Sequence, residues 1–410
     1  MTNLVNLALL ANPNVAKAQA ALRQAQALRD VAAAALLPTI GASASVQRGV
    51  AGGDSTGNRL QLGLDGQWVP DVFGARRKAL DASNAVLAAS ASSLGDVQVQ
   101  LAAEVVLTYV LLRTSQMRWG IAKSNLTSQQ ETLQITDWRQ QAGLVTMLEV
   151  ERARAAAAQT QALLPALQIA IEQTLHALAV LVSRPPGALQ MAVGVAPKFV
   201  NLPTLGTALA LSIPAETLRQ RADVRAAEYQ VAAAFSRLGQ AQAQRMPSFS
   251  IGGSIGLSAI TLAALSKGTS LVASLLGGVT LPVFDGGTLL AQVRVQAAAF
   301  EQAQQVYRSA VLGALKDVEN ALVAVRGDEE RLASLKIAAD AATNAALLAR
   351  QRYSSGLVDF QTVLETQRTQ LATQDGVVSA KADISNDQVR LFTALGGGWS
   401  MADTSVAAAK

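Results

Sequence analysis

The side chains that most often perform catalysis or bind metals are scarce in this sequence. It contains no Cys, and His176 is its only His. A chain without Cys has no thiol nucleophile, no disulfide and no thiolate ligand for a metal. His176 has no second histidine with which to hold a metal or relay a proton, so we expect it to have a structural role. We therefore expect neither a metal nor any other cofactor.

Glycine motifs of nucleotide-binding enzymes are also missing. Asp285–Gly287 reads Asp-Gly-Gly, but the Lys-Ser/Thr pair of a phosphate-binding loop does not follow it. A turn between a strand and a helix explains this stretch. The net charge is +5, with Lys and Arg scattered rather than clustered. Phosphate backbones are bound by clustered cations, so we expect no nucleic-acid partner. Nothing here supports an enzyme.

Two Gly-Leu-Val triplets indicate how the chain is organised instead. They begin at Gly143 and Gly356, which lie 213 residues apart (356 less 143). A long stretch without proline precedes each, and because proline in a helix interior costs about 3 kcal/mol, both stretches can be helical. Residues 75–140 and 288–353 are therefore predicted to be helices of roughly 100 Å each. A glycine after a helix commonly ends it in the left-handed conformation.

The residues after each triplet predict that a second helix returns. Thr146 and Asp359 are candidate N-caps, and Thr146 with Glu149 matches a capping box. The two triplets would then be the tips of antiparallel helical hairpins. Helices this long need a packed face, and one heptad seam is predicted along the second. Its residues are Val311, Leu315, Val318, Leu322, Val325 and Leu332.

The regions before the long helices alternate with a period of two. Apolar residues alternate with small or polar ones over residues 39–46 and 59–68, and again over 248–257 and 270–281. Alternation over about ten residues with one apolar face is typical of a transmembrane β-barrel wall. A rival interpretation makes residues 246–284 a pair of membrane helices, which their density of Gly and Ser disfavours.

Four strands cannot close a barrel, and lipid does not tolerate an open sheet edge. Several copies of the chain must therefore pool their strands. Two copies would give eight strands and three would give twelve, both of which are barrel sizes seen in membranes.

These elements predict an α+β membrane protein built as a tandem repeat of two strands and a long helical hairpin. The first repeat is expected at residues 1–187, with strands at about 39–50 and 59–69 and a hairpin at 75–183 whose tip is 141–147. A linker is expected at 188–215 and a tail at 400–410. The second repeat is expected at residues 216–399, with a helix at 216–245, strands at about 248–258 and 270–281 and a hairpin at 288–396 whose tip is 354–360.

The whole chain resembles the TolC/OprM-type outer-membrane efflux proteins. The resemblance rests on LVNLALLANPNVAKAQAAL (Leu4–Leu22), ALAVLVSRPPG (Ala177–Gly187), LRQRADVRAAEYQVAAA (Leu218–Ala234) and GLVDFQTVLETQR (Gly356–Arg368). The last two are similar to the subfamily that serves resistance-nodulation-division pumps. One departure is Ala222, where the family has Pro.

The resemblance implies a homotrimer whose twelve strands form a barrel in outer-membrane lipid, continuous with a twelve-helix barrel in the periplasm. It implies a passive exit duct that carries drugs or other small molecules, with a periplasmic adaptor and an inner-membrane resistance-nodulation-division pump as partners. It also implies a signal peptide and often a lipid-bearing Cys, which this sequence lacks, so we expect the native chain to extend further. Two alternatives are a soluble coiled-coil scaffold and the duct of a type I protein secretion system.

The resemblance also assigns roles to residues near the tips. The docking end for the adaptor would comprise Gly143, Leu144, Val145, Gly356, Leu357 and Val358. The alternative is that these apolar residues only staple their own helices. Tyr353, Asp359 and Glu365 match positions of the family's pore gate, where acidic rings would attract cations. Asp359 could instead be a plain helix cap, and Tyr353 and Glu365 could lie on a solvated face.

Overall fold

The computed structural model describes residues 1–50, 56–189, 220–261, 263 and 271–397. Most of the expected linker and the whole expected tail lie outside these described residues. The described elements run in the order α1 (Thr2–Ala11), α2 (Pro13–Ala34), β1 (Thr39–Val50), β2 (Thr56–Trp68), α3 (Ala75–Gln141), α4 (Met147–Leu181), α7 (Ala222–Ala243), β3 (Ser248–Ala259), β4 (Leu271–Thr280), α8 (Thr288–Ser354) and α9 (Phe360–Ala394).

The chain divides into two compact units. One unit consists of Met1–Ala18, Leu94–Ala222 and Val311–Lys410, and it contains both hairpin tips. The other consists of Gln19–Ser93 and Asp223–Ala310, and it contains the sheet.

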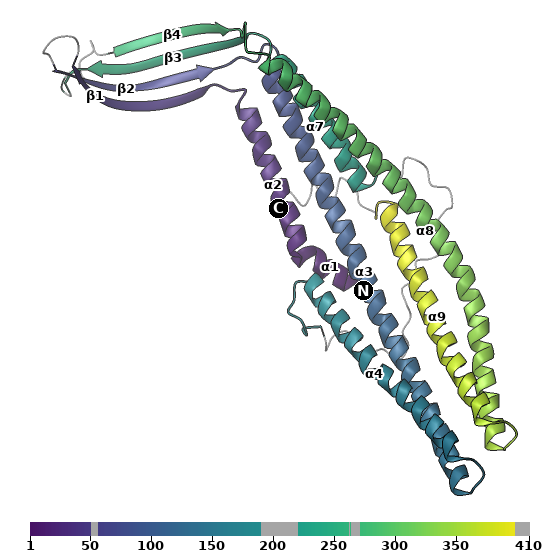
Figure 1. Ribbon diagram of the computed structural model, residues 1–410. Helices are drawn as coiled ribbons and strands as arrows, with labels where there is room; N and C mark the ends of the chain where they lie inside the picture. Colours follow the sequence, from purple (N-terminus) through teal and green to yellow (C-terminus); the bar gives the residue numbers. More distant parts are fainter. Residues whose placement is uncertain (51–55, 190–219, 262, 264–270, 398–410) are drawn as a thin grey trace. The chain divides into compact units, whose positions relative to one another are not determined.

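The helical hairpins repeat to the residue. Helices α3 and α8 have 67 residues each, and α4 and α9 have 35 each. Each helix of the second hairpin begins and ends 213 residues after its counterpart, as 288 less 75 and 394 less 181 show. The two hairpins are drawn in blue and in green to yellow in Figure 1. The predicted tandem repeat of strands and hairpin is confirmed.

The returning helices also end in the same way. Ser183 after α4 and Gly396 after α9 both have positive φ, 56° and 100°. The next backbone N–H reaches five residues back in each, from Arg184 to Ala179 at 2.8 Å and from Gly397 to Phe392 at 2.9 Å. This is the Schellman ending, which satisfies carbonyls that the helix leaves unpaired.

The long helices begin at carboxylates. Asp285 accepts hydrogen bonds from the backbone N–H of Gly287 at 2.8 Å and of Leu289 at 2.7 Å, at the start of α8. The Asp-Gly-Gly stretch is therefore a strand-to-helix turn, as its sequence predicted. Asp71 does the same for α3 through the N–H groups of Arg76 and Arg77, at 3.1 and 2.8 Å.

The strands form one antiparallel sheet in the order β1-β2-β3-β4 (Figure 1). The pairing places Leu64 opposite both Ala42 and Ile255, so apolar side chains share one face. Asp65 lies opposite Gly41 and Ser254 on the other face. The two-residue alternation of the sequence thus becomes one apolar and one polar face.

One local prediction was wrong, and another was confirmed only in part. The helix expected from residue 216 begins at Ala222. Gln220 lies in a turn, and Arg221 is not helical. The heptad seam predicted along α8 is confirmed only in part. Val318 is 4% exposed, and the half-buried members are Val311, Leu322, Val325 and Leu332. Leu315 is 42% exposed, whereas its neighbour Ala314 is 1% exposed. Small Ala side chains occupy six of the eight buried positions of this helix, so a search for large apolar residues missed most of its packed face.

Three helices of the described residues, α3, α4 and α8, are long and apolar enough to cross a membrane by length and composition. At 1.5 Å per residue, however, α3 and α8 are about 100 Å long, roughly three times the thickness of a bilayer's hydrocarbon core. A helix of that length would reach far beyond a bilayer whichever segment it placed there.

Candidate functional site

Both hairpin tips have the same backbone. Gly143 and Gly356 adopt φ of 72° and 77°, the left-handed region that glycine enters without steric cost. The Leu144 N–H donates to the Arg139 carbonyl at 2.8 Å, and the Leu357 N–H donates to the Arg352 carbonyl at 2.9 Å. Each glycine is therefore the residue that stops a 67-residue helix, as the sequence predicted.

The apolar residues of the tips divide into two kinds. Leu144 is 68% exposed and Leu357 is 75% exposed. Val145 and Val358 are half-buried, and Val358 packs against a buried cluster. That cluster comprises Ala153, Ala349, Tyr353, Phe360 and Val363. Val358 thus staples its own helices, whereas each Leu presents its side chain to solvent in a single chain.

Tyr353 lies at the centre of this cluster and is only 2% exposed. Its ring packs edge-on to Phe360, with ring centres 5.7 Å apart. The guanidinium of Arg139 lies over the ring of Tyr353, 4.5 Å from the ring centre, and also donates to the Tyr353 carbonyl. The Tyr353 hydroxyl lies 3.3 Å from both the Thr136 hydroxyl and the Glu149 carboxylate. The solvated-face alternative for Tyr353 is therefore wrong within one chain.

These contacts join the two hairpins. Arg139 and Thr136 belong to α3 and Glu149 to α4, while Tyr353 belongs to α8. Burial raises the pKa of the Tyr353 hydroxyl, and the nearby Glu149 carboxylate raises it further. The hydroxyl therefore stays protonated and donates at any physiological pH.

Asp359 and Glu365 have different surroundings. Asp359 caps α9, because its carboxylate accepts from the Thr362 N–H at 3.0 Å and from the Thr362 hydroxyl at 2.5 Å. The hydroxyl bond and then the backbone bond lower the pKa of Asp359. Glu365 is exposed. The predicted capping box of Thr146 is wrong: Thr146 makes no side-chain cap bond, and the Glu149 carboxylate faces Tyr353 instead.

A ladder of polar side chains on α3 continues upward from the tip. Its four residues follow a spacing of seven and each contacts the second hairpin: Arg118, Asn125, Thr132 and Arg139. Asn125 donates to Gln374 at 3.0 Å, and Thr132 accepts from Gln367 at 3.0 Å.

Arg118 ends the ladder, with Nε 2.9 Å from the Asp375 carboxylate and Nη2 2.6 Å from the Ser379 hydroxyl. Sequence reasoning missed this ladder, although the heptad spacing of polar residues could have revealed it.

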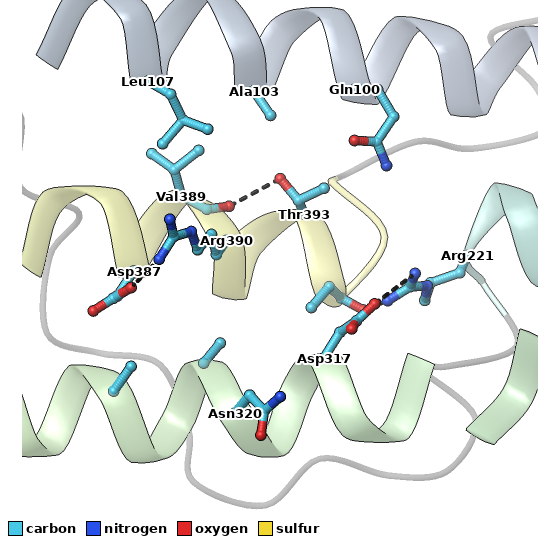
Figure 2. Close-up of a pocket in the computed structure, with 13 residues that line it drawn as sticks. Gln100, Ala103, Leu107, Arg221, Asp317, Asn320, Asp387, Val389, Arg390 and Thr393 are labelled. Atoms are coloured by element: carbon cyan, nitrogen blue, oxygen red, sulfur yellow. Dashed lines mark hydrogen bonds and ion pairs between the residues drawn. The ribbon is translucent and has the colours of Figure 1, made fainter. Parts of the chain in front are cut away.

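A cavity of about 460 Å³ lies between α3, α8, α9 and Arg221 (Figure 2). Figure 2 shows Arg221 pointing at Asp317, and the two charges are 3.5 Å apart. Arg221 also donates to the Ala394 carbonyl at 3.1 Å. The cavity is therefore lined by internally paired charges rather than by free ones, and it was not predicted from the sequence.

Asp387 at the rim of this cavity is an unusual carboxylate. It is 4% exposed and accepts from Arg390 at 3.0 Å. Burial raises the pKa of Asp387, and the nearby Asp328 raises it further, although Arg390 opposes both. A carboxylate that loses water and faces a second carboxylate holds its proton more tightly.

Metal-binding geometry is not found in the described part of the chain. Among those residues no three His, Asp or Glu side chains are arranged to hold a metal ion. His176 is exposed on α4.

Comparison with known sequences gives a consistent result. The family model described as "Outer membrane efflux protein" matches residues 4–184 and 213–397. "Pyoverdine export outer membrane protein OpmQ" of Pseudomonas putida is 31% identical, over 97% of this chain and 86% of the relative. "Toluene efflux pump outer membrane protein TtgI" of Pseudomonas putida is 28% identical, over 98% of this chain and 86% of the relative.

Solved structures agree. The outer-membrane channel OprN superposes with a TM-score of 0.92 at 35% identity, covering 97% of this chain and 90% of that channel. The similarity extends over both the strands and the hairpins.

Proposed function

We propose that three copies of this chain, which belongs to the outer membrane efflux protein family, assemble into one exit duct. The protein is an outer-membrane component of an efflux system, which replaces the alternative of a soluble scaffold. The observation that carries the pooling of several copies is the sheet, and the resemblance to this family supplies the number three. It has four strands and two open edges, β1 and β4, and lipid does not tolerate open edges.

The strands are the segments that meet lipid. They have 10 to 13 residues each, close to the 9 to 11 of a tilted transmembrane strand. Ile40 and Val46 on β1 are both 78% exposed in one chain, and Leu275 on β4 is 83% exposed. These side chains form the apolar belt of the barrel, and the long helices form the wall of the periplasmic tunnel.

The duct is passive and has no catalytic activity. It receives small molecules from an inner-membrane pump through a periplasmic adaptor and releases them outside. Relatives named for pyoverdine export and toluene efflux support a small-molecule cargo. The charges that line the Arg221 cavity are paired with one another, as expected of a structural region.

The tips have two roles in this proposal. The exposed Leu144 and Leu357 dock the adaptor, because both are apolar side chains that the hairpins leave largely uncovered in one chain. The gate comprises Tyr353, Asp359 and Glu365. Tyr353 holds the two hairpins of one chain together, and the two carboxylates lie exposed on the same tip, where three copies would bring them into rings.

Single-channel recording tests the duct. The purified protein is added to a planar bilayer and the current is followed at fixed voltage. Insertion of a duct gives stepwise conductance that prefers cations. Absence of any step, from a sample whose native mass shows an intact trimer, would contradict the proposal.

A further inference from the structure

The sheet of one chain ends at two unpaired strands. In the order β1-β2-β3-β4, strand β1 lacks a neighbour on one side and β4 lacks one on the other. If three copies close a barrel, as the proposed function requires, β4 of each copy must pair with β1 of the next. The internal repeat fixes how those two strands align.

The repeat relates β2 to β4 by the same 213 residues that relate the helices that follow them. By this spacing Thr280 of β4 is the counterpart of Gln67 of β2, because 280 less 67 is 213. Thr39 pairs with Gln67, and Ser248 pairs with Thr280. Ser248 of β3 is therefore the counterpart of Thr39 of β1, which is a spacing of 209 (248 less 39).

The sequence supports the second spacing independently. Pro38 directly precedes β1, Pro247 directly precedes β3, and 247 less 38 is also 209. Both prolines mark the point where the chain enters a strand, at a position where the missing N–H breaks no ladder bond.

Within one chain, β2 pairs with β3 so that Gln67 lies opposite Gly252 and Leu60 lies opposite Ala259. Adding 213 to the number of a β2 residue gives its counterpart in β4. Subtracting 209 from the number of a β3 residue gives its counterpart in β1. We infer that Thr280 of one copy pairs with Ser43 of the next copy (252 less 209 is 43). The same alignment runs in steps of one residue to Ala273, which pairs with Val50 of the next copy.

The two faces of the sheet agree with this register. It places Val279 opposite Ala44 of the next copy, on the apolar face of both strands, and Thr280 opposite Ser43 on the polar face. A slip of one residue would turn one strand's apolar side chains to the polar face of the barrel. A slip by an even number of residues keeps the apolar side chains on the same face, so a slip of two residues is the nearest alternative to test.

Cysteine cross-linking in the intact protein tests the register, and the chain has no native Cys to interfere. Two matched pairs sample the two faces: S43C with T280C, and A44C with V279C. Directly opposite Cβ atoms lie within reach of a disulfide, whereas atoms displaced by two residues do not. Oxidation of a matched pair should join the copies into a covalent trimer on a denaturing gel without reductant.

Mismatched pairs on the same faces are the controls. S45C with T280C and V46C with V279C correspond to a slip of two residues in one direction, and S45C with L276C to a slip in the other. S254C with S274C, whose hydroxyls lie 2.7 Å apart in one chain, should link without a change in mass. We expect about tenfold more covalent trimer from matched than from mismatched pairs, since a two-residue offset exceeds disulfide reach.

The outcomes distinguish a failure of the proposed register from a failure of the trimer. Covalent trimer from a mismatched pair, or from no pair although the native mass is that of three chains, overturns the register and leaves the duct intact. A native mass of one chain, with no cross-links from any pair, overturns the pooled barrel itself.

Discussion

Arg139 of the first hairpin stacks its guanidinium over the ring of Tyr353 of the second, 4.5 Å from the ring centre. With the hydroxyl of Tyr353 near Glu149 and Thr136, one side chain connects α8 to both helices of the first hairpin. The tunnel end of a single chain is therefore held by a buried aromatic with polar contacts at its rim. Any movement of one hairpin away from the other must break these contacts.

Removing the Tyr353 contacts should loosen the tip in two steps. Y353F keeps both ring contacts and loses the hydroxyl bonds, which should cost about 1 kcal/mol. Y353A also loses the packing with Phe360 and should cost about 3–5 kcal/mol. Thermal unfolding measures both, with Y307F as a control for a half-buried tyrosine elsewhere on α8. In the gate proposal Y353A also raises the time spent conducting, and an unchanged conductance would contradict that role.

Asp359 variants should separate a cap from a gate. The pKa of Asp359 lies below its usual 3.8, so its contribution to stability is present above that pH and is lost as the pH falls. D359A should lower the melting temperature at pH 7, with the difference shrinking below about pH 4. D359N should keep the cap, because Asn caps helices as well as Asp does.

The charge of Asp359 is tested by the same conservative variant. If the carboxylates of three copies form a ring, D359N should weaken the preference of the pore for cations at unchanged stability. Equal cation preference in D359N and the native protein would leave Asp359 as a cap only.

Charge at an exposed tip leucine should abolish adaptor docking. L357D and L144D should lose efflux while trimer assembly survives, because neither side chain packs within the chain. Two variants separate the loss of the leucine from the added charge. L357A removes the apolar contact without adding charge. S355D adds a charge next to Gly356 and keeps the leucine. Retained drug resistance in L357D would contradict the docking role, and equal loss in S355D would assign the effect to charge alone.

The buried carboxylate Asp387 should give a pH dependence of the opposite sign. Its pKa is raised above the usual 3.8, so the stability that it contributes is present at low pH and is lost as the pH rises through the raised value. D387N mimics the protonated form and should melt higher than the native protein at pH 7, with equal melting near pH 3. D383N, at a half-exposed carboxylate paired with Arg331 at 3.2 Å, is the control and should lack this gain. A lower melting temperature for D387N at pH 7 would contradict the account.

Much of the fold could be predicted because its signals are local. Gly143 and Gly356 mark the helix ends by their conformational freedom, and alternation of side chains marks the strands. Most of the packed face of α8 could not be predicted in this way. Its buried positions are mostly Ala, as at Ala314, and Ala gives little apolar contrast by which a packed face could be identified.

The contacts of the candidate site depended on tertiary structure. Nothing near Tyr353 in the sequence indicates that Thr136 and Glu149, more than 200 residues away, would face its hydroxyl. The same contact overrode the local capping signal of Thr146, because a carboxylate near a buried hydroxyl is no longer available to the helix start. Arg221 and its cavity likewise join segments that are distant in the sequence.

The most direct test of the pooled duct is the mass of the purified chain by native mass spectrometry, in mild detergent and after detergent removal. The account predicts a species of three chains of 42.5 kDa each that depends on detergent. A stable monomer or dimer that needs no detergent would mean that the four strands do not meet lipid, and it would contradict the account.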